Sequence, residues 1–299
     1  MTRFFPEGEV LLTEDNQSAL HSGEGLKKAF EEGAVLEARA RLCDRDMTLH
    51  FDLGGTHAVM PREESHFPAE GELFRDVAVI TRVGKPCAFT VLRLPQSPGE
   101  PALISRRAAQ ERCLAEYLDG LEEGDVLPAR VTHFEPFGAF CDIGCGIPSL
   151  LSIDCMSVSR ISHPSDRFHL GEDILAAVRA RDEVRLGRRG RISLTHKELL
   201  GTWRENAALF TPGETVLGIA RSVESYGIFV ELAPNLAGLA ESRPGVRPGD
   251  RCSVYIKSIL PEKRKVKLVI IDVYRGGESP IKTRYFIREG NVSDFRYDG

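Results

Sequence analysis

The chain has 299 residues, a length typical of two or three small domains, and 42% of them are hydrophobic, as in ordinary globular proteins. Its apolar runs are all much shorter than the roughly 20 residues that a membrane-spanning helix needs, and residues 1–15 lack a signal-peptide core. We therefore expect a cytoplasmic protein without membrane contact. The net charge of −5 excludes a uniformly basic surface, and seven scattered cysteines without a Cys-x-x-Cys pair favour reduced, buried thiols over disulfides or a metal site.

Residues 1–25 carry one arginine against five acids and predict an acidic arm, either disordered or used in docking. A strand-rich unit follows at residues 26–110. In it, Asp52-Leu53-Gly54-Gly55 marks a turn, and Asp76–Ile80 and Ala102–Ser105 are predicted to be later strands.

Two segments with helical spacing separate the remaining strand-rich units, Arg106–Leu121 and Thr195–Phe210. The second holds the sole tryptophan, Trp203, which is expected to be a packing anchor between neighbouring units. The predicted boundaries are 26–110, 123–199 and 211–272 for the units, 111–122 and 200–210 for the connectors, and 273–299 for a C-terminal tail.

The second and third units are copies of one repeat with a period of about ninety residues. Phe137-Gly138-Ala139-Phe140 in one corresponds to Tyr226-Gly227-Ile228-Phe229 in the other, and Gly171–Ile174 corresponds to Pro248–Arg251. The unit at residues 26–110 is a worn third copy. Short β-rich runs with turns between them, five in each copy, are typical of small closed barrels.

The repeated motif, aromatic-Gly-x-aromatic, pairs Phe137 with Phe140 and Tyr226 with Phe229. We expect the glycine to allow a bulge or sharp twist, which turns both rings of a pair outward on the same side. Two exposed rings make a platform for stacked bases, each worth roughly 1–3 kcal/mol with little sequence preference. An isolated pair would more often fill a barrel core, but its repetition favours the exposed platform.

Cations are concentrated in corresponding hairpins near the end of both copies. Six arginines lie between Arg179 and Arg191, and Lys263-Arg264-Lys265-Val266-Lys267 occupies the matching place in the other copy. Cationic side chains beside aromatic rings can follow phosphates and stack on bases. The alternative interpretation is a solvated hairpin without a ligand.

These residues resemble the S-one RNA-binding domain, a five-stranded OB barrel named for the messenger-RNA-binding protein of the bacterial small ribosomal subunit. The resemblance covers about residues 30–272 in three units and is strongest in the second and third. It implies a mainly β fold of three tandem five-stranded OB-fold barrels joined by short helical connectors. It also implies a ribosome-associated translation factor whose partners are single-stranded RNA, messenger RNA in particular, and the small ribosomal subunit, with no cofactor and no small-molecule substrate.

The family's RNA face carries two aromatics on strand two, a His on strand three, and an Asp and a basic residue near strands four and five. By position, the His place falls on Ser149 in the second unit and on Glu241 in the third, where the Asp place falls on Pro261. In the first unit the ring positions fall on Met47 and His50, so that unit is expected to dock on protein. The predicted RNA-binding residues are Phe137, Phe140, Asp182, Arg188, Arg189, Arg191, Tyr226, Phe229, Lys263, Arg264 and Lys265.

The sequence contains no phosphate loop, His-Glu-x-x-His, Gly-x-Ser-x-Gly or dinucleotide fingerprint, so we expect no enzymatic activity and no catalytic residue. Two alternative functions stay open. The acidic balance suits a protein-interaction scaffold, and an accessory subunit of an RNA-degradation complex would carry the same barrels.

Overall fold

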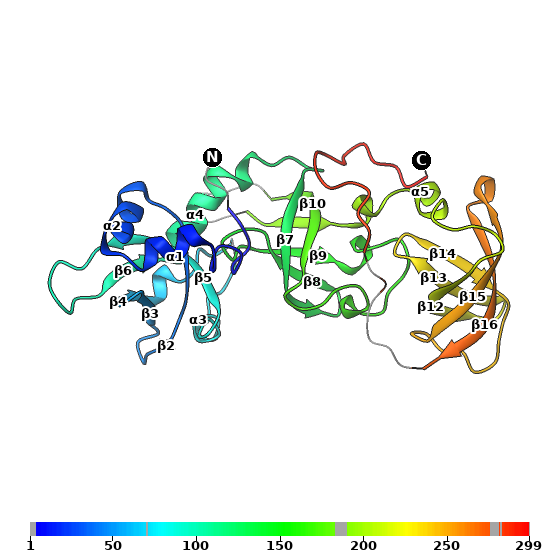
Figure 1. The fold of residues 1–299 in the computed structure, drawn as a ribbon, viewed down its shortest axis with the longest axis horizontal. Helices are drawn as coiled ribbons and strands as arrows, with labels where there is room; N and C mark the ends of the chain where they lie inside the picture. The colour runs from blue at the N-terminus through cyan, green and yellow to red at the C-terminus, as the bar shows by residue number, and fades with distance from the viewer. Residues whose placement is uncertain (1–3, 70, 183–189, 276–280, 282, 299) are drawn as a thin grey trace.

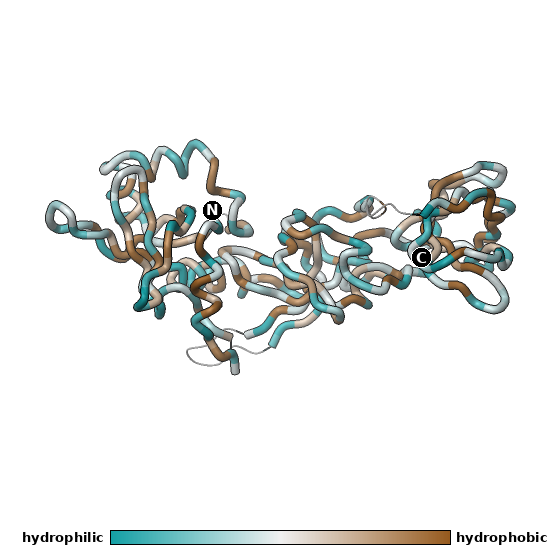
Figure 2. The backbone as a smooth tube through the Cα atoms, turned by 90° about the horizontal axis from the view of Figure 1, so that it is seen from below, coloured by the Kyte–Doolittle hydropathy of each residue, from teal (hydrophilic) through white to brown (hydrophobic). Residues whose placement is uncertain are grey.

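Three β units lie in a row in the computed structural model, which describes residues 4–69, 71–182, 190–275, 281 and 283–298 (Figure 1). Hydrophilic and hydrophobic residues are interspersed along the backbone (Figure 2), and burial alternates along strands such as Leu49–Leu53 and Lys265–Tyr274, as expected where one face of a strand packs on a core and the other meets water. The mainly β, OB-type architecture predicted from the sequence is confirmed. No helix within the described ranges is long and apolar enough to cross a membrane.

Unit one is an open six-stranded sheet in the order β1-β5-β6-β4-β3-β2. The sheet does not close because its first strand is interrupted, so that β1 pairs with β5 whereas β2 pairs with β3. Its core includes Phe51 and Phe89. The elements are α1 (Glu14–Leu20), α2 (Gly23–Glu32), β1 (Leu36–Arg39), β2 (Leu42–Cys43), β3 (Leu49–Leu53), β4 (Thr56–Met60), η1 (Arg62–Glu64), α3 (Asp76–Ile80), β5 (Pro86–Arg93) and β6 (Ala102–Ser105).

The strand predicted at Asp76–Ile80 is wrong, because this segment forms helix α3. In a strand, Val77 and Val79 would share one face, but Val79 is fully buried while Val77 is 59% exposed. Asp76 stands in the first turn of the helix, where a negative charge is favourable. The β-branched residues of the segment favour a strand, but its packing against the core of unit one determines a helix.

Barrel two and barrel three are closed five-stranded barrels in the orders β10-β11-β9-β8-β7 and β12-β13-β14-β16-β15. Their strands are β7 (Val126–Glu135), β8 (Gly138–Asp142), β9 (Pro148–Ser152), β10 (Asp173–Arg181), β11 (Ile192–Thr195), β12 (Thr215–Glu224), β13 (Gly227–Ala233), β14 (Leu236–Ala240), β15 (Arg251–Leu260) and β16 (Lys265–Tyr274). Short helical turns within them are η3 (Ile153–Cys155), η4 (Pro164–Asp166) and η6 (Pro261–Lys263).

Helical segments connect the units where the sequence predicts them. Helix α4 (Arg106–Glu116) and η2 (Leu118–Gly120) precede barrel two, and η5 (Lys197–Leu200) and α5 (Trp203–Ala207) precede barrel three. Ser105 caps α4 by accepting a hydrogen bond from Ala108 N. Trp203 is buried in the core of barrel three, as expected of a packing anchor.

The N-terminal segment does not form the arm that its charge predicts. Phe4 is buried in the core of barrel two, and Glu7 is buried between unit one and barrel two. There Glu7 receives hydrogen bonds from Arg106 Nε at 2.6 Å and Arg82 Nη1 at 2.7 Å, and its backbone N–H donates to Asp142 at 2.7 Å. Burial acts to raise the pKa of Glu7, but Arg106 and Arg82 together with the hydrogen bond from Ala88 N hold that pKa below its usual value.

The C-terminal segment, red in Figure 1, runs across barrel two and reaches α5. The Tyr285 hydroxyl accepts from Leu175 N at 3.1 Å and lies 3.1 Å from His196 Nε2. Because Met156 O can only accept from His196 Nδ1, the ring carries its proton on Nδ1 and Tyr285 donates to Nε2. Near the chain end, Tyr297 O accepts from Trp203 N, so this segment ties barrels two and three together.

Candidate nucleic-acid interface

The rings of Phe137 and Phe140 both lie on the outer wall of barrel two. Phe137 stands in the turn before β8 and is 53% exposed, whereas Phe140, half-buried, lies between the core residues Ala139 and Cys141 on the opposite face of the strand. The two ring centroids are 6.3 Å apart and the planes meet at 85°.

Barrel three repeats this arrangement. Tyr226 is 67% exposed in the turn before β13, and Phe229 points outward between Ile228 and Val230 of the core. The centroids are 6.2 Å apart at 88°. The sequence prediction that both pairs face outward therefore agrees with the described geometry, and we call these two sets of side chains the ring pairs.

The glycines of the motif serve a different purpose from the one predicted. A Cβ added at Gly138 would lie 2.5 Å from Leu151 O, and one at Gly227 would lie 2.5 Å from Ala240 O. Glycine is therefore required because the neighbouring strand approaches closely. The register shifts lie instead in the partner strands β7 and β12.

Strand register places further side chains next to each ring pair. In barrel two, Phe140 stands between His133 of β7 and Leu150 of β9, and Ser193 follows on β11. The His133 ring is stacked against Phe140 with centroids 6.5 Å apart. Sequence reasoning missed His133, although its place seven residues before Phe140 on the preceding strand is what a short hairpin implies.

In barrel three the corresponding row runs from Ser222 through Phe229 and Leu239 to Lys267 of β16. Lys267 is exposed and follows Leu239 in this row, so it places a cation on the same outer face as the ring pair. Lys267 belongs to the cationic run Lys263–Lys267 but is not among the predicted RNA-binding residues. Its place could not be assigned without the parallel pairing of β14 with β16.

The His position of the second unit was assigned wrongly. Ser149 is buried and donates a hydrogen bond to Ile192 O at 2.5 Å, so it points away from the ring pair. Ser152 pairs with Gly138 and is the equivalent of Glu241, which follows the Ala240 that pairs with Ile228. The offset of 89 residues that relates Phe137 to Tyr226 also relates Ser152 to Glu241, so the period of the repeat agrees with the strand register.

The predicted cations of barrel two are only partly described. Arg188 and Arg189 lie outside the described residues. Asp182 and Arg191 are exposed and close the hairpin from β10 to β11, with Asp182 N donating to Arg191 O at 2.8 Å. Arg181 serves the fold instead, because it donates to Asp119 Oδ1 and to three connector carbonyls.

In barrel three, Lys263 and Lys265 are exposed at the turn between β15 and β16. Arg264 caps η6 with a left-handed backbone, φ 47°, and its guanidinium forms an ion pair with Asp298. Lys265 comes two residues before Lys267 and thus shares its outward face, as Arg191 does with Ser193. Pro261 is exposed in η6 and offers no carboxylate there.

Unit one has imidazoles where the barrels have a phenylalanine. His50 points outward from β3 and stacks on His57 of β4 at 5.3 Å between centroids, while its Nε2 lies 2.9 Å from Asp44. Met47 packs against the core of unit one.

All seven cysteines are free thiols and six are buried, and burial raises the pKa of Cys87 to about 12. Across the described ranges, no group of three His, Cys, Asp or Glu side chains is arranged to hold a metal ion.

Two closed OB-type barrels with the same outward ring pair, beside an open third unit, define a tandem OB-barrel protein. No family model matches the chain. The small ribosomal subunit protein bS1 homolog of Bacillus subtilis is 30% identical over 279 residues, which cover 90% of this chain and 67% of that relative. The chain belongs to the small ribosomal subunit protein bS1 family, and the resemblance identified from the sequence is confirmed.

Other relatives differ more in length. The small ribosomal subunit protein bS1 of Rhizobium meliloti is 28% identical over 281 residues, 87% of this chain but 47% of that relative, so the chain spans about half of its length. Among solved structures, a multidomain protein with nucleic acid binding domains from Streptococcus pneumoniae matches 80% of this chain and 74% of its own at 14% identity, with a TM-score of 0.25.

Proposed function

We propose that this protein binds single-stranded RNA, messenger RNA included, through the ring pairs of barrels two and three. The observation that carries the proposal is the repetition of the pair, with the same outward direction and nearly the same centroid distance in both barrels. Exposed rings at such spacing offer stacking surfaces for bases, which duplexes keep internal. Binding requires no catalytic group, and we propose no reaction.

Two linked ring pairs favour avidity. Barrels two and three are joined by buried contacts and by the C-terminal segment, so a strand held by one barrel meets the second at high effective concentration. Lys265, Lys267 and Arg191 place cations on the same outer faces, where they can contact phosphates. Affinity is therefore expected to fall steeply with salt.

Fluorescence anisotropy with labelled oligonucleotides tests the proposal. The protein is expected to bind a single-stranded oligouridylate of about 15 nucleotides and to bind a duplex of the same length much more weakly. Equal affinity for both, or no binding to either at low salt, would contradict it.

We also propose that the protein acts at the small ribosomal subunit in the cytoplasm, which its membership of the bS1 family supports. Unit one, without a phenylalanine or tyrosine pair at its equivalent place, is proposed to contact protein there. Sedimentation with small subunits at low and high salt tests this. A complex that survives ribonuclease but never sediments with ribosomes would favour the scaffold alternative, and co-purification with a degradation enzyme would favour the accessory-subunit alternative.

A further inference from the structure

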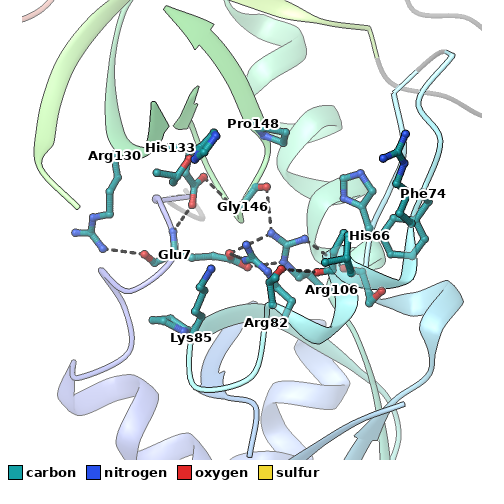
Figure 3. A pocket seen from close by; sticks show the side chains of 18 of the residues that line it. Glu7, His66, Phe74, Arg82, Lys85, Arg106, Arg130, His133, Gly146 and Pro148 are labelled. Atoms are coloured by element: carbon teal, nitrogen blue, oxygen red, sulfur yellow. Dashed lines mark hydrogen bonds and ion pairs between the residues drawn. The ribbon is translucent and has the colours of Figure 1, made fainter. Parts of the chain in front are cut away.

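A cleft of about 640 Å³ lies between unit one and barrel two, directly beside the ring pair of barrel two (Figure 3). Unit one supplies α3 and the turn after it, and barrel two supplies β7 and the start of β9. His133 lines the cleft with one side and stacks on Phe140 with its ring, so the cleft and the ring pair form one continuous surface.

Most cations of the cleft are already neutralised by carboxylates. Arg82 and Arg106 both bind Glu7, and Arg130 binds Asp173 at 2.6 Å and Glu9 at 3.0 Å. Through Glu7, Arg82 of unit one is linked to Arg106 of α4, whereas the pair of Arg130 with Asp173 lies within barrel two.

Two lining cations differ from these. Lys85, in the turn before β5, and Arg75, at the N-cap of α3, are exposed, and within the described residues neither side chain has a hydrogen-bond or ion-pair partner. In Figure 3 Lys85 points into the space below His133. Unpaired cations facing one cleft form a site for anions, since no desolvated acid competes for them.

Aromatic surface also lines the cleft. His66 stacks on Phe74 at 5.3 Å between centroids, and Arg62 lies over the Phe74 ring at 5.0 Å from its centroid. Cations interleaved with flat rings along an open groove are typical of surfaces that hold single-stranded nucleic acid. An acidic peptide would use the cations but has no need of the rings.

We propose that this cleft binds the backbone of the same RNA strand whose bases stack on Phe137 and Phe140, with Lys85 and Arg75 contacting successive phosphates and His133 guiding the strand between the two places. The proposal rests on the proposed function and extends the RNA path from barrel two onto unit one. It assigns to unit one a share of RNA binding in addition to protein contact.

The test compares two double variants of the full chain, Lys85→Ala with Arg75→Ala, and Lys27→Ala with Lys28→Ala. Both remove two exposed cations from unit one, but Lys27 and Lys28 lie on α2 outside the cleft, with side chains 67% and 73% exposed. Each protein is titrated with oligouridylates of about 5 and about 15 nucleotides, because the shorter one matches a single barrel site.

For the longer oligonucleotide, the cleft variant is expected to lose affinity and to reduce the slope of log K against log salt by about 1.4, or roughly 0.7 for each phosphate that the protein no longer neutralises. The shorter oligonucleotide and the α2 variant are expected to bind like the parent. In the parent, the longer RNA should also slow acetylation of Lys85 and leave that of Lys28 unchanged.

The outcomes separate the two proposals. If the parent binds neither oligonucleotide, the proposed function itself fails. If the parent binds both but the cleft variant binds the longer one with the parent's affinity and salt slope, only the cleft proposal is overturned. It is also overturned if the cleft variant keeps RNA binding but loses binding of an acidic polyglutamate peptide, which would make the cleft a protein-docking surface.

Discussion

Arg167 of barrel two and Glu231 of barrel three form an ion pair from which solvent is completely excluded, with Nη1 and Oε1 2.6 Å apart. The second carboxylate oxygen of Glu231 accepts from Arg221, which also lies 3.8 Å from Asp166. Because burying these charges is favourable only when they are paired, the contact fixes how the two barrels are oriented. It thereby fixes the relation between the two ring pairs.

We predict that Glu231→Gln lowers the free energy of unfolding by about 3–5 kcal/mol, since it leaves the buried Arg167 without its counter-charge and removes the closer of the two carboxylates that Arg221 contacts. Urea denaturation measures this loss. Glu224→Gln, on the exposed part of β12, serves as the control and should change stability little. Equal stability of both variants would show that the junction does not depend on the ion pair.

Glu37 predicts a pH dependence of stability in unit one. Its carboxylate accepts from Gly8 N at 2.9 Å, and burial raises its pKa from 4.5 to about 7. Between these two values the folded state binds more protons than the unfolded state, so the free energy of unfolding falls as pH rises through that window, by roughly 3 kcal/mol. Thermal unfolding at pH 5 and pH 8 measures the effect.

Glu37→Gln should remove this group's share of the pH dependence, because the amide stays neutral across the window, and should leave the share of Asp142, whose pKa burial also raises to about 7. The exposed Glu31→Gln should leave it in place. A Glu37→Gln protein whose melting temperature still falls with pH as in the parent would assign the effect to other groups.

The two cations at the end of barrel three should differ in their effect on RNA binding. Lys267 stands beside Leu239 in the row that contains Phe229, whereas Arg264 is already paired with Asp298. Lys267→Ala is therefore expected to reduce affinity and to reduce the salt slope by about 0.7, and Arg264→Ala to change both less. Anisotropy titrations between low and moderate salt measure the slopes. A larger loss for Arg264→Ala than for Lys267→Ala would be evidence that the row from Ser222 to Lys267 is not the RNA-binding face.

The sequence predicted the elements whose signals are local or repeated. The ring pairs are predicted because Phe137-Gly138 and Tyr226-Gly227 recur at one period, and helix α4 is predicted by its helical spacing. Glu7, Lys85 and Lys267 were not selected, because their roles come from residues far away in the chain. Glu7 meets Arg106, and Lys267 meets Leu239, only once the units fold and pack.

The errors have the same origin. Asp76–Ile80 has the composition of a strand but forms a helix, which buries only the side chain of Val79 in the core of unit one. The charge of residues 1–25 predicts an acidic arm, yet Phe4 and Glu7 are buried in contacts with barrel two and α4. Ser149 is a different case, because the 89-residue offset between Phe137 and Tyr226 relates Glu241 to Ser152, as the register across β8 also shows.

That the ring pairs bind single-stranded RNA is tested most directly by the double variant Phe140→Ala with Phe229→Ala. Its affinity for a single-stranded oligouridylate is compared with that of the separate variant Tyr274→Ala. Tyr274, 48% exposed at the end of β16, serves as a control that removes an exposed ring outside both pairs. Since each stacked base contributes roughly 1–3 kcal/mol, the double variant should bind at least about 30-fold more weakly while keeping the parent's unfolding curve, and Tyr274→Ala should bind like the parent. A folded double variant with undiminished affinity would contradict the account.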